Sequence, residues 1–129
     1  MKHIKFRGKG YDGKWLYGDL KHTSNNTYSI IGFNLERRYI VQEETIGQYI
    51  GMKDYNGREI FDGDIIQSSK DGFSSKHEII YVPEEAAFKA RMIDSSIYDY
   101  CSLSKEWIEK FEKVVIGNIH DNPELLKQI

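Results

Sequence analysis

Glycine-containing turn sequences near the middle of the chain constrain its fold more than any other feature. Asn56-Gly57 and Asp62-Gly63 follow each other closely, and Asp12-Gly13 repeats the pattern near the start. Such pairs supply the positive φ that a tight hairpin turn requires. Because short β-rich runs flank these turns, the chain is predicted to fold into short antiparallel strands.

The runs between the turns alternate apolar and polar side chains, which is typical of strands. Strands are predicted over residues 3–9, 15–21, 27–33, 39–41, 45–52, 64–67, 77–82 and 113–120. Residues 86–93 could form a strand or a helix, and their alternation favours a strand. Polar connections are expected at residues 23–26, 34–38 and 68–76. The spacing of Leu103, Trp107, Ile108 and Phe111 predicts one short helix over 104–112. Asn122 and Pro123 predict a terminal helical turn with Asn122 as its cap.

Many short strands with little helix predict a mainly β fold, either a small antiparallel barrel or a sandwich-like arrangement. No repeat or linker divides the 129 residues, so a single domain over residues 1–129 is expected. No apolar run approaches the roughly 18 residues of a membrane-spanning helix, so no membrane association is expected.

The first 22 residues differ from the rest of the chain in charge. They hold six basic side chains against two acidic ones, a net of +4, which leaves −6 for the remainder. Aromatic side chains stand between these cations, as in surfaces that bind single-stranded nucleic acid. The candidate nucleic-acid contacts are Lys5, Arg7, Lys9, Trp15 and Tyr17. The alternative is an ordinary half-buried hairpin with aromatic side chains inward and lysines outward, which the total charge of −2 favours.

Motifs for catalysis or metal binding are scarce. The single Cys101 excludes an intrachain disulfide and a multi-thiolate metal site, and no histidine stands beside it in sequence. Asp62 and Asp64 are the nearest approach to a carboxylate pair for a divalent cation, but turn aspartates more often accept backbone hydrogen bonds. The sequence therefore predicts no catalytic residue, no metal site and no cofactor. A metal-assisted hydrolase that uses Asp62 and Asp64 is the enzymatic alternative.

Three segments resemble the YopX family of bacteriophage and prophage proteins. They are residues 4–8 (IKFRG), residues 47–54 with 56–66 (GQYIGMKD and NGREIFDGDII), and residues 115–126 (VIGNIHDNPELL). The family's central string is similar to Gln-Tyr-Thr-Gly-Leu-Lys-Asp, from which Ile50 and Met52 depart conservatively. Residues 68–111 carry no pattern of the family.

The resemblance implies a fold, an origin and a location, but no activity and no catalytic residue. It implies a small SH3-like antiparallel barrel with extra strands and one or two short helices. It also implies a phage or prophage origin and residence in the cytoplasm of the bacterial host. We therefore expect an accessory protein that acts as a non-enzymatic binding or assembly module. Its partner is expected to be an unidentified protein or further copies of itself in a homo-oligomer, with nucleic acid as the alternative.

Overall fold

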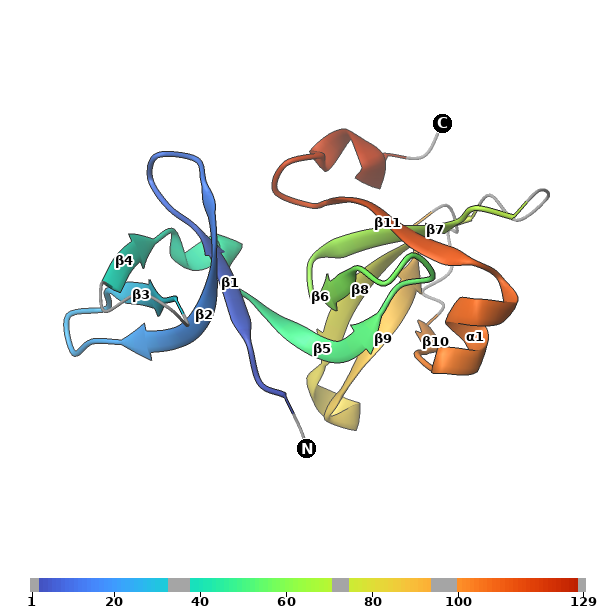
Figure 1. The fold of residues 1–129 in the computed structure, drawn as a ribbon, viewed down its shortest axis with the longest axis horizontal. Helices are drawn as coiled ribbons and strands as arrows, with labels where there is room; N and C mark the ends of the chain where they lie inside the picture. Colours follow the sequence, from blue (N-terminus) through green and yellow to red (C-terminus); the bar gives the residue numbers. More distant parts are fainter. Residues whose placement is uncertain (1–2, 33–37, 71–74, 94–99, 128–129) are drawn as a thin grey trace. The chain divides into compact units, whose positions relative to one another are not determined.

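Short antiparallel strands dominate the computed structural model of the chain (Figure 1). The structure describes residues 3–32, 38–70, 75–93 and 100–127. The chain divides into two compact units, Met1–Gly51 and Met52–Ile129. The single domain over residues 1–129 stays a prediction, because this division does not test whether either unit folds alone.

The first unit is an antiparallel sheet with the strand order β4-β3-β2-β1-β5. Its elements are β1 (Phe6–Lys9), β2 (Trp15–His22), β3 (Tyr28–Ile31), β4 (Arg38–Val41), the 3-10 helix η1 (Glu43–Thr45) and β5 (Gly47–Lys53). The β1-β2 hairpin turns at Asp12-Gly13, as predicted. Gly13 has a φ of +85°, and the Asp12 carboxylate accepts a hydrogen bond from the Lys14 amide at 3.1 Å.

One face of this sheet carries the core of the first unit. Ile30 and Val41 are almost completely buried there. Gly8 lies directly against Val41, since a Cβ at position 8 would stand 2.8 Å from Val41 Cγ2. An isolated bridge from Gly10 to Val41 brings the end of β4 back to the chain that follows β1. The close approach of these two segments explains why position 8 holds glycine.

The second unit contains a five-stranded antiparallel sheet with the order β10-β9-β8-β7-β11. Its elements are β6 (Glu59–Phe61), β7 (Asp64–Ser68), β8 (Lys76–Val82), η2 (Pro83–Glu85), β9 (Ala87–Met92), β10 (Tyr100–Ser102), α1 (Lys105–Lys110), β11 (Lys113–Asn118) and η3 (Pro123–Leu126). The β6 strand follows β5 in the strand order of the first sheet. Isoleucines on β6, β7, β8 and α1 form the core, each 2% exposed or less; they are Ile60, Ile65, Ile66, Ile79 and Ile108.

The mainly β prediction is confirmed, and the predicted turns at Gly57 and Gly63 have the positive φ they require, at +86° and +92°. The strands that the structure describes form two sheets and no closed barrel. The predicted helix is confirmed as α1, whose N-cap Ser104 accepts a hydrogen bond from the Trp107 amide at 3.1 Å. Within the described ranges, no helix has the length and apolar character needed to cross a membrane.

Some details of the prediction differ from the structure. The first strand begins at Phe6 rather than at residue 3. Asn122 occupies the N-cap position and Pro123 begins the last helical turn, as predicted, but the Asn122 side chain makes no capping hydrogen bond and instead accepts one from the Asn118 amide at 3.2 Å. The predicted connections at 34–38 and 68–76 lie partly outside the described residues.

Candidate functional site

Strand register brings the predicted nucleic-acid contacts to one face of the first sheet. Arg7 pairs with Tyr17 and Lys9 pairs with Trp15 across β1 and β2, and paired residues point to the same side. Lys5 precedes Arg7 by two residues and therefore belongs to the same face. The candidate cations Lys5, Arg7 and Lys9 and the rings of Trp15 and Tyr17 are thus on the same side, which differs from the placement of aromatic side chains inward and lysines outward. An ordinary half-buried hairpin without a nucleic-acid role stays the alternative.

The same face extends across β2, β3 and β4. Lys21 pairs with Ser29, which pairs with Ile40, while Asp19 pairs with Ile31, which pairs with Arg38. We call this surface the basic face. Its members are Lys5, Arg7, Lys9, Trp15, Tyr17, Asp19, Lys21, Ser29, Ile31, Arg38 and Ile40. It holds five cations and one carboxylate, whereas the opposite face carries the core with Ile30 and Val41.

Exposure differs strongly along the basic face. The Arg7 side chain is buried, and its guanidinium carbon lies 4.8 Å from the centroid of the Trp15 ring. The Lys9 ammonium is 5.9 Å from the same centroid. Tyr17 and Ile40 are well exposed, at 46% and 56%. The accessible part of the face therefore lies toward β2, β3 and β4, while Arg7 acts as a support for Trp15.

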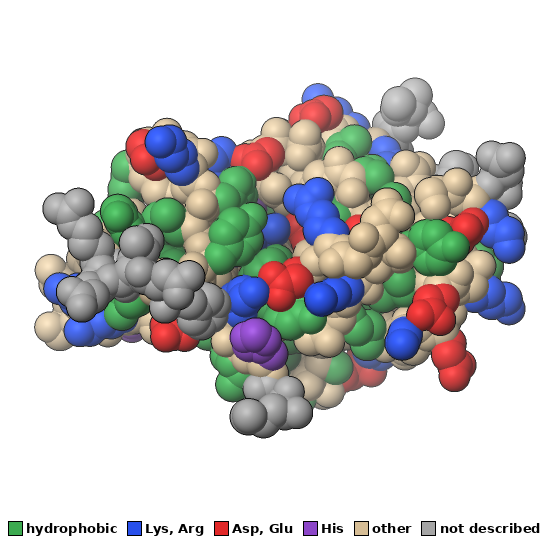
Figure 2. Space-filling view, in the orientation of Figure 1, with side chains coloured by type: hydrophobic (Ala, Val, Ile, Leu, Met, Phe, Trp, Pro, Cys, Tyr) green, Lys and Arg blue, Asp and Glu red, His purple; other side chains and the backbone are tan. Residues whose placement is uncertain are grey.

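Sequence reasoning missed Lys21, Arg38 and Ile40 as members of this surface. Lys21 lies in a predicted strand, but its neighbours across the sheet depend on the β2-β3 register, which the turn sequence does not reveal. Arg38 was expected in a polar connection and instead begins β4. Figure 2 shows Lys and Arg side chains scattered among hydrophobic ones in the view it gives of the surface.

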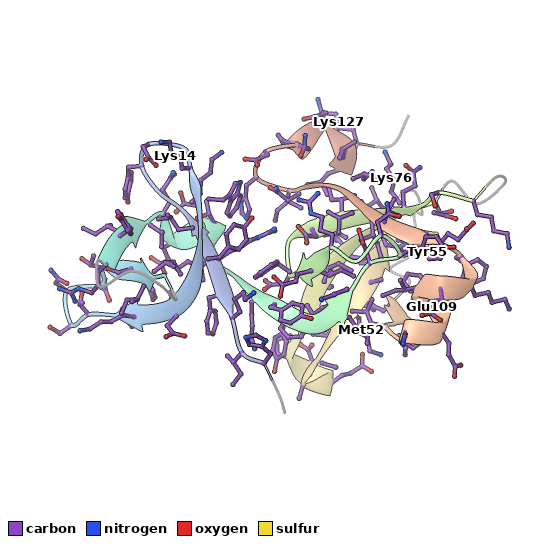
Figure 3. All side chains as sticks on the ribbon, in the orientation of Figure 1. Lys14, Met52, Tyr55, Lys76, Glu109 and Lys127 are labelled. Atoms are coloured by element: carbon purple, nitrogen blue, oxygen red, sulfur yellow. The ribbon has the colours of Figure 1, made fainter. Side chains whose placement is uncertain are left out.

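Two shallow cavities open on the first unit. One, of about 380 Å³, lies beside the β1-β2 turn and is lined by Tyr11, Lys14 and Tyr39 among others; Figure 3 marks Lys14 on this turn. The other, of about 530 Å³, lies between the β2-β3 turn and β4 and is lined mainly by hydroxyl groups, with Arg38. Both are within the usual size range of small-molecule sites.

Asp54, in the central string shared with the family, has a structural role. Its Oδ1 accepts hydrogen bonds from the amides of Asn56 and Arg58 at 2.9 and 2.8 Å, and its Oδ2 accepts one from the Val115 amide at 2.9 Å. One buried carboxylate thus holds the turn between β5 and β6 against β11. The Tyr55 amide strengthens this link by donating to the Lys113 carbonyl at 2.8 Å.

Tyr55 stands on the surface of the same turn, marked in Figure 3 together with Glu109 of α1. A hydrogen bond to the Glu112 carboxylate raises the pKa of Tyr55 above its ordinary value of 10.0, and the negative charge of Glu112 adds to this effect. Partial desolvation and the charge of Glu109 act in the same direction.

The terminal string of the family is also structural. Asn118 Oδ1 accepts hydrogen bonds from the amides of His120 and Asp121 at 3.0 and 2.9 Å. Gly117 lies so close to Asn122 that a Cβ would stand 2.5 Å from its Oδ1. These contacts hold a tight reversal after β11.

The candidate metal pair does not form a recognisable cation site. Asp64 is 1% exposed, and its Oδ2 accepts a hydrogen bond from the Phe61 amide at 2.8 Å, as expected of a turn aspartate. Asp62 is only half-buried. Among the residues the structure describes, no three His, Cys, Asp or Glu side chains gather in a way that could hold a metal ion.

Cys101 lies beside a histidine that sequence reasoning did not connect with it. Its Sγ is 3.7 Å from Nε2 of His77, which comes from β8. The buried His77 ring packs edge-on against Trp107 of α1, with ring centroids 5.3 Å apart. Since 24 residues separate Cys101 from His77, only the β8-β9-β10 pairing reveals this contact.

Together, the two antiparallel sheets and the basic face define a small, mainly β protein with a cationic surface on its first unit. The chain belongs to the YopX protein family, whose family model matches residues 5–127. It is also similar to the crystal structure of protein EF1440 from Enterococcus faecalis, with 27% identity and a TM-score of 0.62. That alignment covers 98% of this chain and 100% of the other. No curated protein matches the chain significantly.

Proposed function

We propose that the chain is a non-enzymatic binding or assembly module of a bacteriophage or prophage, and that it works in the cytoplasm of the bacterial host. Family membership supports the origin. The single observation that carries the binding role is the basic face, where exposed Tyr17 and Ile40 stand on the same side as five cations and one carboxylate. We further propose that β1 to β4 form an SH3-like half-barrel, in line with the return of β4 to Gly10.

Self-association is the first form of this proposal. Residues 1–51 hold eight basic and five acidic side chains, a net of +3, whereas residues 52–129 hold ten and fifteen, a net of −5. The basic face of one copy is therefore complementary in charge to the second unit of another. Light scattering after size-exclusion chromatography tests this form. A defined oligomer that dissociates at high salt and after Lys21→Glu with Arg38→Glu is expected, and a monomer under all conditions contradicts it.

Single-stranded nucleic acid is the second candidate partner, favoured because cations and aromatic rings occupy the same face. Binding of a fluorescent oligonucleotide at about 50 and 200 mM salt tests it, since phosphate contacts weaken steeply with salt. Absence of binding at the lower salt concentration removes this candidate.

Calorimetric titration with magnesium and manganese tests whether the chain is non-enzymatic. Metal binding that Asp64→Asn abolishes would favour the metal-assisted hydrolase instead.

A further inference from the structure

The second cavity of the first unit has the composition of an oxyanion site. It lies between the β2-β3 turn and β4, with a volume of about 530 Å³. Its polar lining consists of Thr23, Ser24, Asn25, Thr27, Ser29 and Arg38, and Ile40 supplies an apolar wall. The part of the lining that the structure describes contains no carboxylate. We call it the hydroxyl pocket.

The β2-β3 turn holds part of this lining in a fixed arrangement. The Thr23 amide donates to the Thr27 carbonyl at 2.9 Å, and the Asn26 amide donates to the Thr23 carbonyl at 3.1 Å. The Thr23 hydroxyl donates to Asn25 Oδ1 at 2.5 Å, and the Thr27 carbonyl is a second acceptor of the same hydroxyl at 3.1 Å. Because Thr23 occupies the carbonyl oxygen of the Asn25 amide, the NH₂ group of that amide is the end left to donate.

Several donors of the pocket are uncommitted. Among the residues the structure describes, the hydroxyls of Ser24, Thr27 and Ser29 and the guanidinium of Arg38 have no hydrogen-bond or ion-pair partner. Ser29 is 3% exposed, yet it lines the cavity. Lys21 pairs with Ser29 on the same face and adds a second cation near the pocket.

We propose that the hydroxyl pocket binds the phosphoryl group of a phosphomonoester. A tetrahedral dianion has three terminal oxygens to satisfy, and the pocket offers hydroxyl and amide donors together with a guanidinium suited to bidentate contact. A carboxylate has only two oxygens and one charge and would leave donors unused. Ile40 provides contact for the organic group attached to the phosphate. The pocket would then also accept the phosphorylated end of a nucleic-acid strand, an extension that rests on the nucleic-acid partner proposed above.

Amide chemical-shift mapping with inorganic phosphate and then with deoxyadenosine 5′-monophosphate tests the pocket. Shifts confined to residues 23–29 and 38–40 are expected for both ligands, and none for deoxyadenosine or for acetate at equal ionic strength. Arg38→Gln is expected to weaken binding of the monophosphate about tenfold or more, because a charge-assisted contact is lost. Thr27→Val is expected to weaken it less, and Lys14→Gln, a cation outside the pocket, serves as the matched control.

The inference is overturned if the monophosphate causes no shifts at these residues, if acetate matches it, or if Arg38→Gln binds as well as the unmodified chain. Two oligonucleotides, one with a 5′-phosphate and one with a 5′-hydroxyl, distinguish failure of the hydroxyl pocket from failure of the nucleic-acid candidate. If the monophosphate binds and neither strand does, the pocket is supported and the nucleic-acid candidate fails. If both strands bind equally and the monophosphate does not, the pocket fails and the candidate stands.

Discussion

Asp54 illustrates how one side chain can join segments that lie far apart in the sequence. Its carboxylate accepts three backbone hydrogen bonds, two from its own turn and one from Val115, which is 61 residues away. Hydrogen bonds to a charged acceptor contribute more to stability than neutral ones, and loss of the acceptor leaves buried amides unsatisfied.

Replacing Asp54 is therefore expected to destabilise the chain strongly. We expect Asp54→Ala to lower the free energy of unfolding by about 3 kcal/mol, measured by urea denaturation. Asp54→Asn keeps an acceptor for part of this network and is expected to lose less. Asp19→Ala, at an exposed position of β2, is the control and is expected to change stability by less than about 0.5 kcal/mol. Equal stability of Asp54→Ala and the control would contradict the role of the carboxylate.

Tyr55 provides a test that depends on pH. Its pKa is raised in the folded chain, chiefly by Glu112, so the folded state resists loss of the phenolic proton. The stability that this contact contributes is present below pH 10 and is lost as the pH rises through the pKa of the folded chain. The difference in tyrosinate absorbance between the unmodified chain and Tyr55→Phe reports the ionisation of Tyr55. This difference is expected to develop above pH 10.0. Glu112→Gln is expected to shift it toward lower pH, and no shift would show that Glu112 is not the cause.

At the scale of elements, the contact between β1 and β4 depends on the absence of a side chain. A Cβ at Gly8 would meet Val41 at 2.8 Å, and Val41 is buried in the core of the first unit. Overpacking of this kind forces neighbouring side chains or backbone to move.

We expect Gly8→Ala to lower the free energy of unfolding by about 1–3 kcal/mol. Val41→Ala removes the two methyl groups that the new Cβ meets at 2.8 and 3.1 Å but keeps Val41 Cβ at 2.9 Å. The double variant is therefore expected to lose somewhat less than the two single variants combined. The coupling should be at least about 0.5 kcal/mol in a denaturation cycle. Strict additivity would mean that Gly8 is needed for another reason.

Turns and strands could be predicted from local sequence because each rests on a few neighbouring residues. Gly13, Gly57 and Gly63 mark their turns through the positive φ that they adopt. The basic face was predicted only in part, since Arg38 and Lys21 join it through pairing across β3, a register that hydrophobic alternation does not determine. The Cys101–His77 contact depends on tertiary approach and carries no local signal.

At the scale of the whole molecule, the two units differ in sign of charge, with +3 on residues 1–51 and −5 on residues 52–129. Any nucleic-acid partner should therefore be bound by the first unit and repelled by the second. Because of this asymmetry, a few cations of the first unit should determine how the affinity for nucleic acid changes with salt concentration.

If single-stranded nucleic acid binds the basic face, each phosphate neutralised contributes about 0.7 to the slope of log affinity against log salt. Lys21→Gln with Arg38→Gln is then expected to reduce the magnitude of the slope by about 1.4. Lys70→Gln, a cation of the second unit, should leave the slope unchanged. An unaltered slope in the double variant would place the phosphates elsewhere on the chain.

The bond from Val115 to Asp54 also has a consequence for the order of events during biosynthesis. Asp54 is added to the growing chain 61 residues before Val115, which supplies its third donor. At about 5–20 residues per second, that interval is roughly 3–12 s. Throughout it the nascent hairpin lacks its final anchor, so the Asp54 turn can reach its native hydrogen bonding only after β11 has been made.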